Sequence, residues 1–237
     1  MKIALLGYGR MGHEIEKLAV SRGHTIQVKI DNEDEWTAKT AFLKECDVAI
    51  EFTIPAIAIS NIKRCFAVGI PVVVGTTGWY EHFGEVTELC IKMDGCLFYA
   101  SNYSIGVNVF FEINRKLASL LESYTMYKPA MTEIHHTLKL DAPSGTAITL
   151  AKDMISANHN YTGYTVGTTE EGKIPVTSVR EGNVTGTHTV SWTSDVDQIT
   201  ITHEAYNRLG FAIGAVLAAE WVYSRKGVFT MKDLLSL

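Results

Sequence analysis

Residues that can transfer a proton or hold an anion lie close together between positions 133 and 146. Glu133 comes first, the adjacent histidines His135 and His136 follow, and Lys139 comes three residues later. A histidine titrates near neutral pH and can give a proton to a reacting atom, whereas a lysine supplies a fixed positive charge. This combination predicts a site that binds an anion and protonates it.

Strand geometry determines which of these side chains share a face. An extended backbone over residues 130–139 places His135 and Lys139 on one face and His136 on the other. One imidazole and one ammonium group then converge. Because adjacent strand residues point apart and no third ligand has suitable spacing, we expect no metal site at the two histidines. The alternative is a packed histidine beside a solvated lysine.

A second anion-binding feature follows directly. The residues from Asp141 to Thr146 read as a turn that opens a helix over 146–155. The first N–H groups of a helix lack intrahelical partners, and with the hydroxyls of Ser144 and Thr146 they suit a carboxylate. We therefore expect Ser144, Gly145 and Thr146 to bind a small dicarboxylate, although Ser144 is equally suited to an ordinary helix cap.

A glycine-rich turn near the N-terminus predicts a dinucleotide cofactor. Residues 7–12 fit the pattern G-x-G-x-x-G directly after a predicted strand and before a predicted helix. The pyrophosphate is expected at the helix N-terminus. Asp31 ends the next strand, where a carboxylate either binds ribose hydroxyls and favours NADH or serves only the turn. Arg10 and Lys29 leave NADPH open. The residues assigned to this part of the cofactor site are Gly7, Gly9, Arg10, Met11, Gly12 and Asp31.

Other predicted strands end in polar or glycine residues at the same sheet edge. In a doubly wound sheet, ligands bind at the carboxyl ends of the strands. The segment 75–78, Gly-Thr-Thr-Gly, is placed to meet the nicotinamide half, although turn and cap roles compete for Thr77 and Asn102. The residues assigned to the cofactor at these ends are Phe52, Thr53, Gly75, Thr76, Thr77, Ala100 and Asn102.

The elements that must position these residues alternate along the first hundred positions. Apolar strands are predicted at 2–6, 25–30, 47–52, 70–74 and 96–100, with helices at 10–21, 56–67 and 80–93 between some of them. This alternation is typical of a Rossmann-type, doubly wound parallel sheet. A further apolar helix at 211–223 is expected to return to it. The dinucleotide-binding domain is predicted to comprise residues 1–104 plus 209–237.

The middle of the chain has a different character. After a predicted helix at 105–121, polar and apolar residues alternate with period two around 187–192 and 199–202. Such strands suit a mixed or antiparallel sheet with one polar face. We expect residues 105–208 to form an α+β domain that binds substrate and mediates oligomerisation, so the fold class is α/β with a second α+β domain.

Bulk properties exclude several classes of partner. The chain has 237 residues and a formal net charge of −5, without a basic stripe, so nucleic acid is not expected. Its longest apolar stretch is too short for a bilayer, no signal peptide is apparent, and a cytoplasmic location is expected. The cysteines Cys46, Cys65, Cys90 and Cys96 form no C-x-x-C pair and are expected to be reduced core thiols.

At residues 133–147 the chain resembles the dihydrodipicolinate reductase family, whose signature E-x-H-H-x-x-K-x-D-A-P-S-G-T-A it matches completely. The resemblance extends to the glycine turn and to segments 75–78, 102–108, 186–190 and 208–215. It implies reduction of 4-hydroxy-tetrahydrodipicolinate, or the dihydrodipicolinate formed from it, by NADH or NADPH in diaminopimelate and lysine biosynthesis. It also implies a homotetramer built through the second-domain sheets.

The resemblance assigns roles as well. It makes His135 the general acid, and Lys139, His136, Gly145 and Thr146 groups that hold the cyclic imine dicarboxylate. Because a straight strand turns His136 away, a bulge or bend near the two histidines is predicted. Two other functions are compatible with the patterns, an aspartate-type dehydrogenase and a non-catalytic dinucleotide sensor, although a sensor does not need a proton donor.

Overall fold

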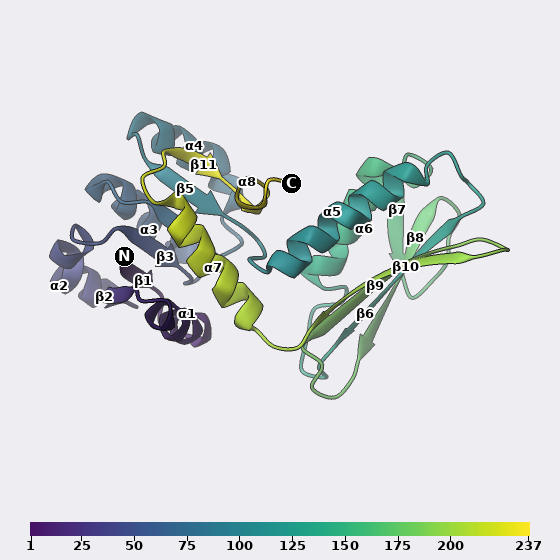
Figure 1. Ribbon diagram of the computed structural model, residues 1–237, viewed down its shortest axis with the longest axis horizontal. Coiled ribbons are helices and arrows are strands. Elements are labelled where there is room, and N and C mark those ends of the chain that lie inside the picture. Colours follow the sequence, from purple (N-terminus) through teal and green to yellow (C-terminus); the bar gives the residue numbers. More distant parts are fainter. The chain divides into compact units, whose positions relative to one another are not determined.

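The computed structural model describes residues 1–237 and divides into two compact units (Figure 1). Met1–Ile105 and Leu209–Leu237 form the first unit, and Gly106–Arg208 form the second. Each unit has its own sheet and its own buried apolar residues. The chain therefore leaves the first unit once and returns to it once.

The first unit is built on a parallel sheet. Its strands are β1 (Lys2–Leu6), β2 (Thr25–Ile30), β3 (Val48–Glu51), β4 (Val72–Val74), β5 (Cys96–Tyr99) and β11 (Gly227–Phe229). They are ordered β11-β5-β4-β3-β1-β2, and every neighbouring pair is parallel. The strand order reverses between β1 and β3, so their carboxyl ends form the crevice where such sheets bind ligands. This confirms the predicted doubly wound sheet.

Helices cover both faces of this sheet because its strands are apolar on both sides. One face packs against α1 (Arg10–Ser21), α7 (Leu209–Val222) and α8 (Met231–Leu235), and the other against α2 (Glu33–Leu43), α3 (Pro55–Val68) and α4 (Phe83–Lys92). A short 3-10 helix, Tyr80–His82, precedes α4. The alanines of α7 are fully buried, which confirms that this helix returns to the first unit.

The second unit contains a mixed sheet. Its strands are β6 (Lys128–His135), β7 (Gly163–Val166), β8 (Lys173–Arg180), β9 (Gly186–Thr193) and β10 (Gln198–Ala205). The order is β10-β9-β6-β8-β7, with the β10, β9 and β6 pairs antiparallel and the β6, β8 and β7 pairs parallel. On β9, His188, Val190 and Trp192 are buried, whereas the residues that alternate with them, Thr187, Thr189 and Ser191, are partly exposed. The predicted period-two strands are therefore confirmed.

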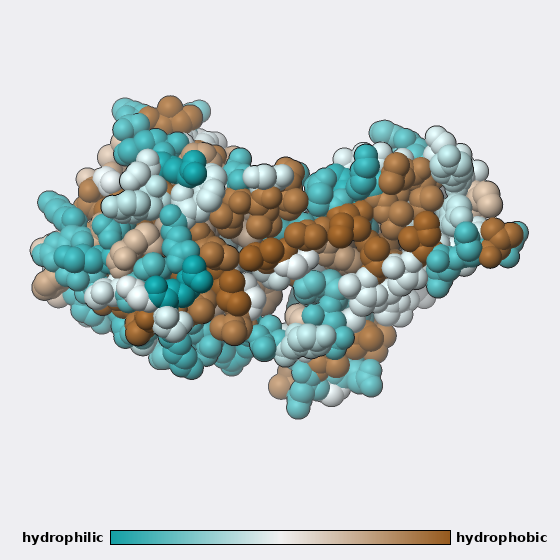
Figure 2. All heavy atoms as spheres, viewed as in Figure 1, coloured by the Kyte–Doolittle hydropathy of each residue, from teal (hydrophilic) through white to brown (hydrophobic).

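Two helices cover the buried face of the second sheet. They are α5 (Ile105–Leu120) and α6 (Gly145–Ala157), and residues such as Phe110 and Leu150 pack against Met131 and Val190 of the strands. The outer side of α5 is also apolar. Figure 2 shows hydrophobic side chains in a row along this helix, where Val109, Ile113 and Leu120 are exposed.

The predicted extended segment 130–139 needs a correction. The strand β6 ends at His135, and the chain then makes a turn in which the Lys139 N–H bonds to the His136 carbonyl at 3.1 Å. The predicted bend near the two histidines is therefore present, but Lys139 does not lie on a continuation of the strand. Its position follows from a turn and not from strand alternation.

All four cysteines are buried and unpaired, as predicted. Burial raises the pKa of Cys46 to about 11 and that of Cys96 to about 12. The thiols therefore stay protonated at neutral pH. None of the helices combines the length and the apolar character that crossing a membrane requires.

Candidate functional site

The glycine turn between β1 and α1 depends on its glycines. Gly7 has a φ of +91°, and a Cβ there would lie 2.2 Å from the Phe52 carbonyl oxygen. A Cβ on Gly12 would lie 2.6 Å from the Gly7 oxygen, so α1 can begin this close to the turn only without a side chain. Both positions require glycine for the backbone itself.

Gly9 differs from its neighbours because nothing lies within 4 Å of the place where its Cβ would be. It is also the N-cap of α1, and no side chain caps the helix there. No side chain therefore caps the first N–H groups of the helix, and this arrangement suits a phosphate. The residues present fit the pyrophosphate of a dinucleotide.

The turns after β3 and β4 come together at the same sheet edge. The Thr53 N–H donates to the Thr76 hydroxyl at 2.8 Å, and a Cβ on Gly75 would overlap the Phe52 ring. With the glycine turn they surround a cavity of about 420 Å³. It is lined by Gly9, Arg10, Met11, Phe52, Thr53, Pro55, Gly75, Thr76 and Thr77. All but Pro55 belong to the predicted cofactor set.

The remaining predicted cofactor residues do not line this cavity. Gly7 and Gly12 shape the turn, and Asp31 accepts a hydrogen bond from the Tyr8 N–H at 2.7 Å. Ala100 is buried, and the Asn102 side chain accepts from the Ser104 N–H at 2.9 Å, as expected of a turn residue.

Lys29 is engaged within the protein. Its ammonium lies 2.7 Å from the Glu16 carboxylate and donates to the Tyr8 hydroxyl at 2.9 Å. Hydrogen bonding to Glu16 raises the pKa of Lys29, and the same contact lowers the pKa of Glu16. The charge of this lysine is therefore already neutralised beside the turn. The sequence patterns indicated the lysine but not its two partners.

In the second unit, strand register gathers polar residues at one end of the buried face. Glu133 of β6 is paired with His188 of β9 and with Ser178 of β8, and His135 is paired with Arg180. Directly paired residues project from the same face of a sheet. The apolar core of this unit therefore gives way to a polar cluster where β6 ends.

The His135 side chain is almost completely buried in this cluster. Its Nδ1 is 3.1 Å from the Glu133 carboxylate, at an angle that is not that of a hydrogen bond. Burial lowers the pKa of His135, the positive charges of Lys139 and Arg180 lower it further, and the carboxylate of Glu133 opposes them. The imidazole is therefore neutral at neutral pH in the free protein.

Glu133 is completely buried and ionised. Both of its oxygens accept the Ser144 N–H at 3.1 Å, and the Arg180 guanidinium donates to one of them at 3.1 Å. Burial opposes ionisation, but these hydrogen bonds outweigh it, so the pKa of Glu133 lies below its usual value. The predicted segment includes Glu133 without a role of its own, and no local pattern of the sequence indicates a role for His188 or Arg180.

Lys139 forms an ion pair with Asp141 at 2.7 Å. Hydrogen bonding to the lysine lowers the pKa of Asp141. The lysine side chain is about one-fifth exposed, so an incoming anion can reach it only by competing with this carboxylate. His136, in the turn before it, is partly exposed.

The start of α6 is as predicted in position but not in every detail. Ser144 is the N-cap, and its hydroxyl accepts from the Ala147 N–H at 3.2 Å and lies 3.0 Å from Nε2 of His188. This side chain is buried. Its hydroxyl therefore caps the helix, which was the alternative to substrate binding. Gly145 and Thr146 are more exposed and carry the first N–H groups of the helix.

Glu133, His135 and His188 also offer donor atoms within 4.8 Å of one another, which is a set that transition metals bind. The carboxylate is however already held by the Ser144 N–H and by Arg180. Lys139 and Arg180 add positive charge nearby, which opposes a cation. The cluster therefore suits a proton and an anion better than a metal.

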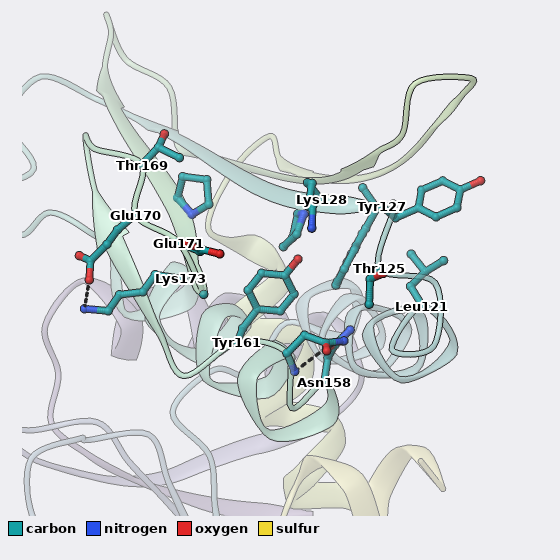
Figure 3. Close-up of a pocket in the computed structure, with 15 residues that line it drawn as sticks. Leu121, Thr125, Tyr127, Lys128, Asn158, Tyr161, Thr169, Glu170, Glu171 and Lys173 are labelled. Atoms are coloured by element: carbon teal, nitrogen blue, oxygen red, sulfur yellow. Dashed lines mark hydrogen bonds and ion pairs between the residues drawn. The ribbon is translucent and has the colours of Figure 1, made fainter.

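A second cavity, of about 560 Å³, lies at the other end of β6 (Figure 3). Lys128, Tyr161 and Trp192 are among the residues that line it, and none of the predicted site residues is. Lys128 and His135 are seven residue steps apart along the strand, which is roughly 23 Å. This cavity is therefore distinct from the polar cluster.

A parallel-sheet unit with an open glycine turn and a mixed-sheet unit with an imidazole, a lysine and a helix N-terminus define a class, the two-domain nicotinamide-dependent oxidoreductases. A family model described as "Dihydrodipicolinate reductase, N-terminus" matches residues 1–103, and one described as "Dihydrodipicolinate reductase, C-terminus" matches residues 106–235. The chain belongs to the dihydrodipicolinate reductase family.

Individual relatives agree with this membership. A 4-hydroxy-tetrahydrodipicolinate reductase of Christiangramia forsetii is 50% identical over 236 residues, covering 100% of this chain and 98% of the relative. The enzyme of the same name from Akkermansia muciniphila is 36% identical and covers 97% of this chain and 95% of the relative. A dipicolinate-bound dihydrodipicolinate reductase from Paenisporosarcina sp. TG-14 shares the fold, with a TM-score of 0.77, 22% identity and coverage of 97% of each chain.

Proposed function

We propose that this chain reduces 4-hydroxy-tetrahydrodipicolinate, or the dihydrodipicolinate formed from it by loss of water, to tetrahydrodipicolinate in diaminopimelate and lysine biosynthesis. The observation that carries the proposal is the polar cluster of the second unit, where a buried imidazole, a lysine and a helix N-terminus occur together. The full-length relative at 50% identity supports the same substrate.

Each group has a part in the reaction. NADH or NADPH, when bound at the glycine turn, supplies the hydride. His135 gives a proton to the ring position where electron density builds up as the hydride arrives. Lys139 and the N–H groups of Gly145 and Thr146 hold the carboxylates and so fix the ring. His136 stands in the turn between the acid and the lysine and contacts the substrate from there.

In the free protein, the proposed acid does not yet carry the proton that this step needs. His135 is neutral before the substrate arrives, because burial and two cations lower its pKa. A dianionic substrate neutralises the positive charge of Lys139 and adds negative charge beside the imidazole, so binding raises the pKa of His135. Substrate binding and uptake of the catalytic proton are thereby coupled.

We infer a preference for NADH. Asp31 is held at the end of β2 by the Tyr8 N–H, where its negative charge repels a 2′-phosphate. Lys29 is paired with Glu16 and is not free to compensate. Arg10 lines the cavity and serves the pyrophosphate.

The test is a coupled assay in which the product of the synthase reaction is offered with NADH or NADPH and absorbance is followed. We expect turnover of the cyclic imine and none of aspartate, and a higher kcat/KM with NADH. Oxidation of amino acids without reduction of the imine would favour an aspartate-type dehydrogenase. A kcat/KM that is higher with NADPH would refute the NADH preference alone.

The chain is also proposed to assemble as a homotetramer through the outer face of the second-unit sheet. The threonines on that face of β9 and β10 are partly exposed, and Thr189 and Thr202 are hydrogen-bonded to each other across it at 3.1 Å. Thr200 of β10, which is paired with Ser191 of β9, is exposed on the same face. A face of this kind suits contact with an identical copy.

A further inference from the structure

Glu133 and Arg180 have no part in the chemistry proposed above, although they form an ion pair beside it. Glu133 is completely buried, Arg180 is one-fifth exposed, and Nη2 lies 3.1 Å from Oε1. Burying a carboxylate is costly unless hydrogen bonds and an opposite charge compensate. We propose that this pair is a positioning device that aligns the acid, the lysine turn and the carboxylate cradle together. The inference rests on the proposed function.

The carboxylate contacts two of the three parts. Oε2 of Glu133 is 3.1 Å from Nδ1 of His135, and both oxygens accept the N–H of Ser144, the residue that caps α6. The position of one side chain therefore sets both the ring of the acid and the first turn of the helix.

The guanidinium contacts the third part. Arg180 donates to the backbone carbonyl of Asp141 at 2.6 Å and to that of Lys139 at 3.3 Å. The same side chain donates to Glu133. A planar guanidinium can serve several acceptors in fixed directions, which an ammonium group cannot. The turn that carries Lys139 is thus attached to β8 and to the carboxylate.

The pair also determines which nitrogen of His135 carries the proton. An ionised carboxylate only accepts hydrogen bonds, so a small rotation of the ring places a proton on Nδ1, facing Glu133. Nε2 is then left to transfer protons. Gly186 lies beside it, and a side chain there would come within 3.0 Å of Nε2. The glycine leaves that side of the acid uncovered.

The first test removes the charge of Glu133 and keeps its shape. Lys139, Asp141, Arg180 and His188 also face the imidazole, and they stay unchanged in Glu133→Gln. We expect kcat to fall roughly 10- to 100-fold, as when an outer partner of a functional histidine is lost. The alkaline limb of the kcat profile should move to lower pH because the imidazolium loses its counterion. The matched control is Glu122→Gln, which removes an exposed carboxylate paired with His159.

The second test changes the geometry of Arg180 and keeps its charge. In Arg180→Lys, the turn at 139–141 loses its fixed donors, so KM should rise about tenfold with kcat within about threefold and the alkaline limb in place. Arg115→Lys is the control, since Arg115 pairs with Glu112 and Asp153 away from the cluster. A Glu133→Gln variant with wild-type kcat and an unmoved alkaline limb would overturn the proposal, and so would an unchanged KM in Arg180→Lys.

A measurement on the unaltered protein covers the case in which a variant fails to fold. The ring nitrogens of ¹⁵N-histidine report the tautomer, and neutral His135 should carry its proton on Nδ1. Finding the proton on Nε2 would contradict the device. This readout does not need turnover, so a protein that fails to reduce the imine disproves the proposed function while the nitrogen signals still decide the role of the pair.

Discussion

In the proposed reaction, the surroundings of His135 determine when this residue takes up its proton. In the free protein the imidazole is buried beside two cations, and its pKa is lowered. In the proposed reaction, the charge that reverses this balance is the one that the substrate brings. An acid that gains its proton only with a dianion in place does not hold an uncompensated charge between turnovers.

The role of His135 can be tested by truncation. His135→Ala should lower kcat by roughly two to four powers of ten, because general acid catalysis contributes about this much. The measurement is steady-state turnover of the synthase product at saturating cofactor. His159→Ala, which removes a largely exposed histidine of the same unit, is the control. Turnover that survives unchanged in His135→Ala would remove this residue from the role of acid.

At the scale of elements, substitutions at two glycines of the turn before α1 test cofactor binding and stability separately. Gly9→Ala should leave the unfolding midpoint nearly unchanged, because the new Cβ has open space, but weaken NADH binding at least about tenfold where the pyrophosphate approaches the backbone. Gly12→Ala should lower stability, because its Cβ meets the Gly7 oxygen at 2.6 Å. Calorimetry of NADH binding and thermal unfolding of both variants test this. Equal effects of the two substitutions would contradict it.

The buried end of β9 makes the stability of the second unit depend on pH. Burial, with the neighbouring His135, lowers the pKa of His188 to about 4, below its usual value near 6.5. The unfolded chain therefore binds the proton first as the pH falls. The resulting stability is complete above pH 6.5 and is lost between that value and pH 4, by on the order of 3 kcal/mol.

Urea unfolding at pH 7.5 and pH 5, followed by circular dichroism, measures this loss. In His188→Gln the side chain cannot take up a proton, so the difference in unfolding free energy between the two pH values should shrink. The control His159→Gln should keep the wild-type difference, because His159 is exposed. A His188→Gln variant with the full wild-type difference would show that other groups cause the acid sensitivity.

Much of the fold followed from apolar periodicity, and the exceptions have physical reasons. The strands of the first sheet are buried on both faces and read as short apolar runs. The helix α2 was not predicted, since only Trp36 and Leu43 of its residues are buried and no apolar stripe marks it. The strand β8 was also missed. Its inward residues change from Ile174 and Val176 to Ser178 and Arg180, which interrupts the alternation.

The proposed site also has parts that the local sequence predicts and parts that it does not. Residues 133–146 could be predicted as a site because the proposed acid, cation and carboxylate cradle are neighbours in the sequence. Arg180 and His188 reach the cluster only through pairing of β6 with β8 and β9, 47 and 55 residues beyond Glu133, and no local spacing reports such pairing. Lys139 was expected to follow strand alternation, but the chain turns after His135.

At the scale of the whole molecule, the association of subunits is the property to test. The full chain should sediment at four times its mass of 26.2 kDa. A charge on the outer face of the second sheet, as in Thr202→Arg, should yield smaller species, because an isologous contact places the new charge beside its own copy. Ile91→Arg, on an exposed position of the first unit, is the control. A monomer in the wild type, or a tetramer that Thr202→Arg does not disturb, would exclude this face.

The four buried cysteines have a practical consequence for such experiments. Thiol reagents act on accessible thiolates, and here the sulfur atoms are enclosed, with raised pKa values that keep them protonated. A maleimide dye offered to the folded chain therefore has no native target. One cysteine introduced on an exposed position of either unit would take up a single fluorophore. With one such cysteine in each unit, energy transfer would report the distance between the two dyes during turnover. None of the native cysteines would have to be replaced.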